Sequence, residues 1–181
     1  LFSIPFYLSN FNFTFFNSFF ESISGLTTTG FSTFKSVKYL DPTLILWRSS
    51  SQWLGGLYFL FFLILIFSKK IFNYKMINLT FSGDSNFKSE ENIKSNLIKI
   101  FIFYSILSFL CLTALNISGL RLYNSLNLTM TLISSGGFLP SDSLGEIINT
   151  NIQKITLSLF FILSLLNFFL IFNLSNKKKI I

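Results

Sequence analysis

The amino-acid sequence predicts an all-α polytopic membrane protein built from repeated helix–pore loop–helix units. Hydrophobic residues make up 51% of the chain and charged residues only 12%, whereas soluble domains carry about a quarter charged residues. Three apolar stretches are long enough to cross a bilayer. Two shorter apolar stretches end in hydroxyl-bearing residues and glycine, which is typical of loops that enter a membrane and return.

Three stretches have the length and composition of membrane-spanning helices, which need about 20 apolar residues. They run from about Thr43 to Ser68, from about Leu97 to Ser118 and from about Ile155 to Leu174. Residues 1–8 are too short to span and are interpreted as the end of a preceding helix. We therefore expect the sequence to enter a larger protein partway along its chain.

The distribution of lysines predicts which side of the membrane each loop faces. Cytoplasmic loops carry an excess of Lys and Arg, and lysines are concentrated between the first two predicted spans and after the third. Residues 9–42 and 119–153 are then expected on the outer side. Within the inner linker, Phe81–Asn92 is rich in Gly, Asp, Asn and Ser, which predicts a loop.

Two apolar stretches, Phe15–Leu26 and Leu122–Ile133, are too short to cross the membrane. Twelve helical residues extend about 18 Å, which is near half a bilayer. Each stretch is followed at once by Thr or Ser and glycine. This pattern predicts a re-entrant pore helix followed by a filter strand, although either segment alone could be an interfacial amphipathic helix.

An internal repeat at an offset of 107 residues favours the pore-loop interpretation. Asn17-Ser18 falls on Asn124-Ser125, and the segment 27–31 (TTTGF) falls on 134–138 (SSGGF). Internal repeats are common in membrane transport proteins, which build their binding sites where repeats meet. The predicted parts are a first repeat at 1–68, a cytoplasmic linker at 69–96, a second repeat at 97–176 and a basic cytoplasmic end at 177–181.

Both short helices lead into residues suited to binding a cation without fixed charge. A cation that crosses a membrane exchanges its water shell for other oxygens, which backbone carbonyls and Thr or Ser hydroxyls can supply. Glycine reaches the required backbone angles at low cost, and the preceding helix adds the negative end of its dipole. Either tetrapeptide alone is more often a simple turn. The predicted ion ligands are Thr27, Thr28, Thr29, Gly30, Ser134, Ser135, Gly136 and Gly137.

Several neighbouring residues have a structural interpretation. Asn17 and Asn124 are expected to be helix N-caps, and Gly55-Gly56 is expected to permit close helix packing. Glu21 is either a buried hydrogen-bonding anchor or a group that faces an outer vestibule. Arg48, near the outer end of its helix, is expected to snorkel toward the membrane surface.

Composition argues against enzymatic chemistry and against nucleic-acid binding. Histidine is absent and Cys111 is the single cysteine, so no nucleophile–base pair and no cysteine-based metal site is evident. The net charge of +7 is explained by the topology of the lysines rather than by a nucleic-acid partner. No cofactor is predicted.

The sequence resembles a known family, the Trk/Ktr/HKT potassium transporter superfamily, and most closely its bacterial Trk branch. Asn17–Phe31 (NSFFESISGLTTTGF) and Leu46–Leu57 (LWRSSSQWLGGL) resemble the first repeat of that family. The second repeat resembles it more weakly, at Lys94–Leu120, Ser134–Phe138 and Leu166-Asn167-Phe168. The resemblance extends over essentially the whole chain, in the order and spacing of the family.

The resemblance implies that the chain holds the first two of four repeats that together form one pore, with Gly30 and Gly137 as filter glycines. The implied function is potassium uptake across the bacterial inner (plasma) membrane, through a carbonyl-lined filter that binds K⁺ at the predicted ligands. The implied partners are the potassium ion, the lipid bilayer, the remaining two repeats, a second copy in a homodimer and a cytoplasmic nucleotide-binding regulatory subunit.

Two departures from the family pattern leave alternatives open. Ser134-Ser135 keeps hydroxyls but lacks the methyl group that packs a threonine, and Asn124 stands where the family often has Asp. A protein of the same fold could conduct sodium or both ions. A non-conducting, truncated remnant is the other alternative.

Overall fold

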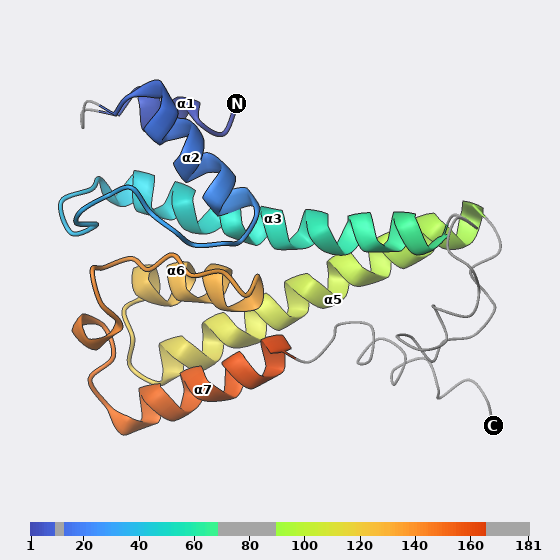
Figure 1. Ribbon diagram of the computed structural model, residues 1–181. Coiled ribbons are helices and arrows are strands. Elements are labelled where there is room, and N and C mark those ends of the chain that lie inside the picture. The colour runs from blue at the N-terminus through green and yellow to red at the C-terminus, as the bar shows by residue number, and fades with distance from the viewer. Residues whose placement is uncertain (10–12, 69–89, 166–181) are drawn as a thin grey trace.

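The computed structural model describes residues 1–9, 13–68 and 90–165, and every regular element among them is a helix (Figure 1). This observation confirms the predicted all-α fold. The elements are α1 (Ile4–Tyr7), α2 (Phe15–Leu26), α3 (Pro42–Ser68), α5 (Glu90–Ile117), α6 (Leu122–Ile133), the short 3₁₀ helix η1 (Leu144–Glu146) and α7 (Asn151–Leu165).

The two short helices, α2 and α6, have the bounds that the sequence predicts. Their N-caps differ from the prediction. The hydroxyl of Thr14 caps α2 by accepting the N–H of Asn17 at 3.3 Å, and Arg121 is the N-cap of α6. Asn17 and Asn124 are each the third residue of a helix, so the prediction that they are caps is wrong.

The long helices begin earlier than their apolar stretches. α3 starts with Pro42, whose fixed φ suits the first helical position. α5 starts at Glu90, inside the predicted linker, so Glu90–Asn92 is helical rather than part of the predicted loop. Its first turns contain Glu90, Glu91 and Lys94, which form helices well but add nothing to an apolar count. α7 starts at Asn151, and the end of the third predicted span lies outside the described residues.

Leu97–Ile117 of α5 is the one stretch in the described ranges that is long and apolar enough to cross a membrane, with a mean hydropathy of 2.2. The apolar part of α7 that is described, Asn151–Ser164, is shorter. α3 has 27 residues, but its first half carries Arg48 and Gln52, both of which are buried inside the molecule. These polar residues make α3 less apolar than a helix surrounded by lipid. Their contacts inside the protein explain why they are tolerated there.

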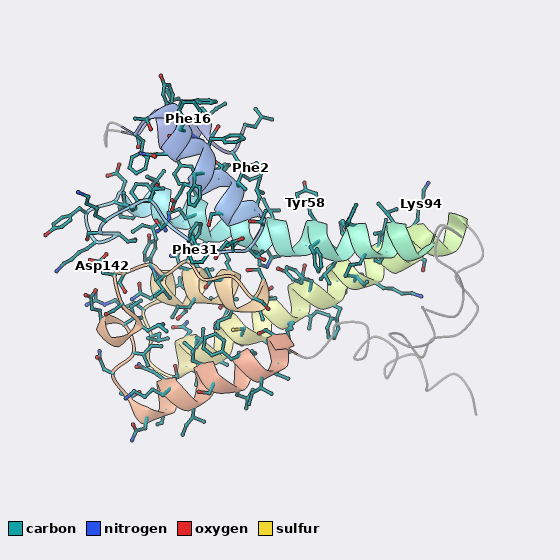
Figure 2. All side chains as sticks on the ribbon, in the orientation of Figure 1. Phe2, Phe16, Phe31, Tyr58, Lys94 and Asp142 are labelled. Atoms are coloured by element: carbon teal, nitrogen blue, oxygen red, sulfur yellow. The ribbon has the colours of Figure 1, made fainter. Side chains whose placement is uncertain are left out.

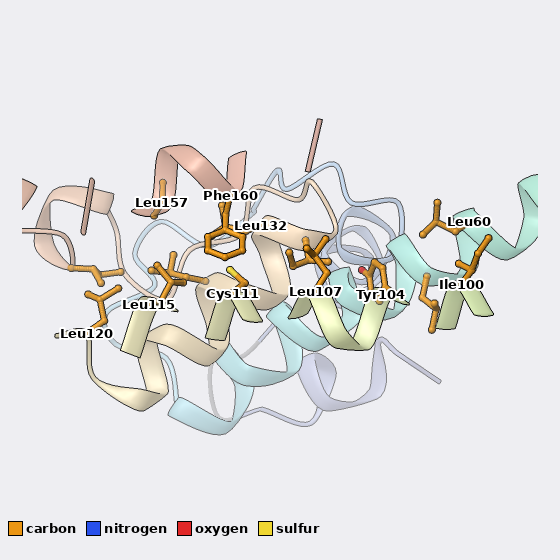
Figure 3. Packing of buried hydrophobic residues seen from close by; sticks show 14 of the residues in the cluster. Leu60, Ile100, Tyr104, Leu107, Cys111, Leu115, Leu120, Leu132, Leu157 and Phe160 are labelled. Carbon is orange, nitrogen blue, oxygen red and sulfur yellow. The ribbon is translucent and has the colours of Figure 1, made fainter. Parts of the chain in front are cut away.

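α6 lies at the centre of the fold, between α3 on one side and α5 on the other (Figure 1). α2 packs on the opposite side of α3, and α7 packs on α5 and α6. Cys111 of α5, Leu132 of α6 and Phe160 of α7 meet in the main hydrophobic core (Figure 3). Tyr104 of α5 ties this core to α3 by donating its hydroxyl hydrogen to the carbonyl of Trp53 at 3.0 Å.

The described end of the predicted inner linker and the predicted outer loop lie at opposite ends of the molecule. Lys94, near the end of the predicted linker 69–96, and Asp142, in the predicted outer loop, are far apart along the long axis (Figure 2). At the Asp142 end, its carboxylate accepts hydrogen bonds from the Ser36 hydroxyl (2.7 Å) and the Val37 and Lys38 N–H groups. The outer loops of the two repeats are therefore tied together.

Glu21 of α2 and Arg48 of α3 form a buried ion pair, with 2.9 Å between Arg48 Nε and Glu21 Oε1. Glu21 also accepts hydrogen bonds from the Ser32 hydroxyl and the Thr33 N–H. Glu21 is therefore a buried anchor rather than a vestibule group. Arg48 is 1% exposed, so the prediction that it snorkels is wrong: its charge has a partner inside the protein.

The buried ion pair generates a prediction for stability. Glu21→Gln should lower the free energy of unfolding by about 3–5 kcal/mol, because the Arg48 charge then stays buried without a counter-ion. The double variant Glu21→Gln/Arg48→Met should lose much less, since it buries no unpaired charge. Thermal unfolding of the detergent-purified protein measures both variants, and equal losses in the two would contradict this role.

The outer-loop contact generates a prediction for pH dependence. Hydrogen bonds from the Ser36 hydroxyl, then from Val37 N–H, hold the pKa of Asp142 below its ordinary value. A carboxyl with a lowered folded-state pKa stabilises the contact above its unfolded pKa, and this stabilisation is lost as pH falls through the folded pKa. Cleavage of the 33–41 segment by an acid-active protease should therefore rise as pH falls from about 5 to about 3.

The matched variants for this experiment are Asp142→Asn and Glu146→Gln. Asp142→Asn should be cleaved readily already at the upper pH and should change little on acidification. Glu146 is an exposed carboxylate in the same loop, so Glu146→Gln should keep the native profile. A native profile in Asp142→Asn would remove Asp142 from this role.

Candidate functional site

α2 and α6 end in the same backbone geometry, and each leads into one of the predicted loops. We define the first loop as residues 27–31 and the second loop as residues 134–138. Thr28 has φ +56° and Ser135 has φ +55°, which is the left-handed region. These are equivalent positions at the 107-residue offset, so the repeat found in the sequence is also a repeat of backbone conformation.

The hydrogen bonds that end the two helices also correspond. In each, the left-handed residue donates its N–H to the carbonyl three positions back, and the next residue donates to the carbonyl five positions back, as in a Schellman motif. The donor–acceptor pairs are Thr28–Gly25 and Thr29–Ser24 (both 3.0 Å), and Ser135–Leu132 (3.0 Å) and Gly136–Thr131 (2.7 Å).

The left-handed residues are unusual because glycine normally occupies this position of the motif. A non-glycine residue in a rarely populated backbone region costs about 1–3 kcal/mol, and a β-branched residue is a genuine outlier there. Thr28 is β-branched, so its conformation must be imposed by its surroundings. Strained positions of this kind cluster at functional sites, which supports assigning one to these loops.

Gly30 and Gly137, the two predicted filter glycines, lie backbone against backbone. A Cβ added to Gly30, whose φ is +79°, would lie 2.6 Å from Gly137 Cα and 2.7 Å from Gly137 N. A Cβ added to Gly137 would lie 3.4 Å from Gly30 Cα and 3.7 Å from the Thr29 carbonyl oxygen. The two loops, far apart in sequence, therefore meet at these two glycines.

The eight predicted ligand residues lie together but differ in exposure. Ser134 is buried, and its hydroxyl donates to the Met130 carbonyl of its own helix at 2.8 Å. The hydroxyls of Thr27 and Thr29 are exposed and hydrogen-bonded to each other at 2.8 Å. The half-buried residues are Thr28, Gly30 and Gly136, and the other exposed ones are Ser135 and Gly137. One edge of both loops is accessible, and the other packs against α3.

The first loop is held by its own short helix. The hydroxyl of Ser24 in α2 donates to the carbonyl of Phe31 at 2.5 Å. Beyond the loop, Ser32 and Thr33 are anchored by Glu21, again from α2. The Arg48 guanidinium, which neutralises Glu21, also donates to the Ser32 hydroxyl at 3.0 Å. The chain returning from the first loop is therefore fixed by a connected set of polar contacts.

The second loop is held by α3, a helix of the first repeat. Gln52 accepts the N–H of Phe138 at 3.1 Å, and the guanidinium carbon of Arg48 lies 4.2 Å from the centroid of the Phe138 ring. Gly56 lets α3 approach Ser134, since an added Cβ would lie 2.9 Å from Ser134 Cβ. Arg48, Gln52 and Gly56 are spaced four apart and share one helix face.

Gln52 is the residue of the site that the sequence prediction missed. It belongs to the WRSSSQWLGG segment, which entered the prediction as a family signature and not as a set of contacts. The four-residue spacing from Arg48 to Gln52 to Gly56 was the signal that could have found it. By contrast, the predicted close packing at Gly55-Gly56 is confirmed: Gly55 abuts the Leu26 carbonyl at the end of α2, and Gly56 abuts Ser134 at the end of α6.

The site offers neutral oxygens. Over the described ranges there is no group of three or more His, Cys, Asp or Glu side chains able to hold a metal ion. The oxygens that the residues of the two loops carry are those of backbone carbonyls and of threonine and serine hydroxyls. Such oxygens replace the water of a weakly hydrated monovalent cation without binding it too tightly to leave.

Known proteins with similar sequences are transport proteins. An uncharacterized cation transporter of Methanocaldococcus jannaschii is 35% identical over 136 residues, which is 75% of this chain and 28% of that protein. The Trk system potassium uptake protein TrkG of Escherichia coli K12 is 27% identical, over 95% of this chain and 36% of that protein. The prediction that the chain is not an enzyme is confirmed.

The fold also matches a solved structure. The crystal structure of the potassium transporter TrkH from Vibrio parahaemolyticus superposes with a TM-score of 0.73 and 25% sequence identity, over 94% of this chain and 34% of that one. The chain therefore spans well under half the length of the relatives it matches. Residues 2–180 match the family model described as a cation transport protein, and the chain belongs to this family, TrkH.

Proposed function

We propose that this chain forms half of the pathway through which a bacterial inner-membrane protein takes up potassium. The carbonyls of residues 27–30 and 134–137 are the ligands of the dehydrated ion, and two further repeats supply the rest of the ring. The observation that carries the proposal is the backbone contact of Gly30 with Gly137, in two loops of equal geometry.

The electrostatics of the loops suit a cation. α2 and α6 both end at these loops, beside the middle of α3 (Figure 1). The carboxyl end of a helix carries about half a negative charge. Two such ends directed at one place favour a monovalent cation, and they do so without a carboxylate that would hold the ion fast.

The left-handed residues explain how the carbonyls become accessible to an ion. Thr28 and Ser135 have left-handed backbone angles immediately after each helix, so the residues that follow leave the helix and form an irregular loop. Carbonyls beyond the end of a helix are not used by intrahelical hydrogen bonds. Residues 29–30 and 136–137 can therefore present them to an ion.

The relatives also support a set of partners for the chain. They include Trk system potassium uptake proteins, which supports potassium as the ion and the bilayer as the surroundings. A homodimer and a cytoplasmic nucleotide-binding regulatory subunit complete the proposed assembly. The regulatory subunit would bind at the end of the molecule where Lys94 lies (Figure 2).

Gly30→Ser is the direct test of the filter. A serine Cβ at this position has no room against Gly137 and requires a positive φ, so it should displace both loops. In a bacterium that lacks its own potassium uptake and expresses the natural reading frame, rubidium uptake should fall about tenfold or more, equal to about 1.4 kcal/mol of lost ion stabilisation. Sodium entry should persist or rise.

The control is Gly145→Ser, the same substitution at a glycine of the outer loop with no atom within 4 Å of an added Cβ. It should leave rubidium uptake at the native level. Unchanged uptake in Gly30→Ser would remove Gly30 from the filter. Native sodium uptake equal to or above rubidium uptake would favour a sodium-conducting protein, and no uptake of either ion would favour a non-conducting remnant.

Thr28→Gly tests whether the strained left-handed backbone of Thr28 contributes to ion selectivity. Glycine relieves about 1–2 kcal/mol of steric cost, which is partly offset by about 0.5–1 kcal/mol of added chain entropy in the unfolded state. Thermal stability in detergent should therefore be unchanged or slightly raised. The rubidium-to-sodium uptake ratio should fall, because the loop can take up more conformations. A large loss of stability would contradict strain at Thr28.

A further inference from the structure

Gln52 is fully buried and is the one side chain of α3 that accepts a hydrogen bond from the backbone of the second loop, among the contacts of the described residues. Its amide lies so close to Gly136 that an added Cβ at Gly136 would collide with the amide oxygen. Its Nε2 has no hydrogen-bond partner within the described part of the chain. The hydrogen bond from Phe138 N–H is therefore the polar contact that orients this amide.

The hydrogen bond from Phe138 N–H to Gln52 also sets the direction of the Gly137 carbonyl, because both groups belong to one planar peptide. The N–H of Phe138 and the carbonyl of Gly137 belong to one planar trans peptide, so the two groups point in opposite directions. When the N–H points at Gln52 on α3, the Gly137 carbonyl must point away from α3, toward the accessible edge of the loops. Glycine gives this peptide unusual freedom to rotate, so an acceptor is needed to hold it.

The second loop lacks the support that the first loop receives from its own helix. In the first loop, Ser24 of α2 donates its hydroxyl hydrogen to the Phe31 carbonyl. The equivalent of Ser24 at the 107-residue offset is Thr131, whose hydroxyl donates instead to the carbonyls of Asn127 and Leu128 within α6. The acceptor that fixes the second loop is Gln52, which comes from the other repeat.

We propose that Gln52 is a positioning residue for ion selectivity: it locks the Gly137–Phe138 peptide so that the Gly137 carbonyl faces the ion. This inference rests on the proposed function, since it assigns a role to the same loops. It goes further by making selectivity at the second loop depend on a side chain of the first repeat that does not touch the ion.

The test compares rubidium and sodium uptake by the natural reading frame carrying Gln52→Met, which preserves side-chain volume but removes the acceptor. The rubidium-to-sodium ratio, normalised to protein in the membrane, should fall about fivefold or more, as expected when a buried N–H loses its partner. Gln52→Glu retains an oxygen at the position of Oε1 and should restore most of the ratio. Ser49→Ala, a buried α3 hydroxyl bonded within its own helix, should behave as native.

A merely structural role for Gln52 predicts a different result. Uptake of both ions would then fall in proportion to the amount of folded protein, with an unchanged ratio, and this outcome overturns the inference. If Gln52→Met does not reach the membrane, Gln52→Asn decides, since its amide falls short of Phe138 by one methylene. A native ratio in membrane-inserted Gln52→Asn overturns the inference, and a lowered ratio supports it.

The Gly30→Ser variant separates this inference from the proposed function. A lowered ratio in Gly30→Ser with a native ratio in the Gln52 variants overturns the role of Gln52 and leaves the filter in place. A native ratio in Gly30→Ser, or no rubidium uptake by the native protein, overturns the filter, and the role of Gln52 fails with it.

Discussion

The buried ion pair between Glu21 and Arg48 is the contact around which the loop region is arranged. A charge removed from water requires a partner and satisfied hydrogen bonds, and here the partners come from three segments: α2, α3 and the chain that returns from the first loop. The same guanidinium stacks on Phe138, the last residue of the second loop. The depth of α2 against α3 and the course of both loops are thereby fixed together.

The two loops reach one backbone geometry by different means. Ending a helix with a left-handed residue uses only main-chain donors and acceptors, so the same pattern recurs in TTTG and SSGG despite their different side chains. Beyond the helix end, the course of the chain depends on side chains, and these differ. The first loop uses hydroxyl and carboxylate groups of its own helix, whereas the second uses the amide and guanidinium of α3.

The length of the two apolar stretches was enough to predict α2 and α6 to the residue, and the repeat placed Gly30 and Gly137 at equivalent positions. Both features can be found from the order of residue types along the chain alone. The location of Arg48 was not predictable from its own neighbourhood, because an arginine near a helix end snorkels unless a distant carboxylate is buried beside it. The role of Gln52 was missed for the same reason: its partner, Phe138, lies in the other repeat.

Because α3 serves both loops, the two repeats are not independent modules despite their shared pattern. A second repeat moved into another protein without the first would lack α3, the helix that holds its loop. A duplicated first repeat would contain an α3 whose Gln52 amide had no Phe138 N–H to accept. The two repeats are thus asymmetric, since α3 of the first repeat supports the loop of the second. Exchange of whole repeats between related proteins is therefore constrained by the face of α3 that carries Arg48, Gln52 and Gly56.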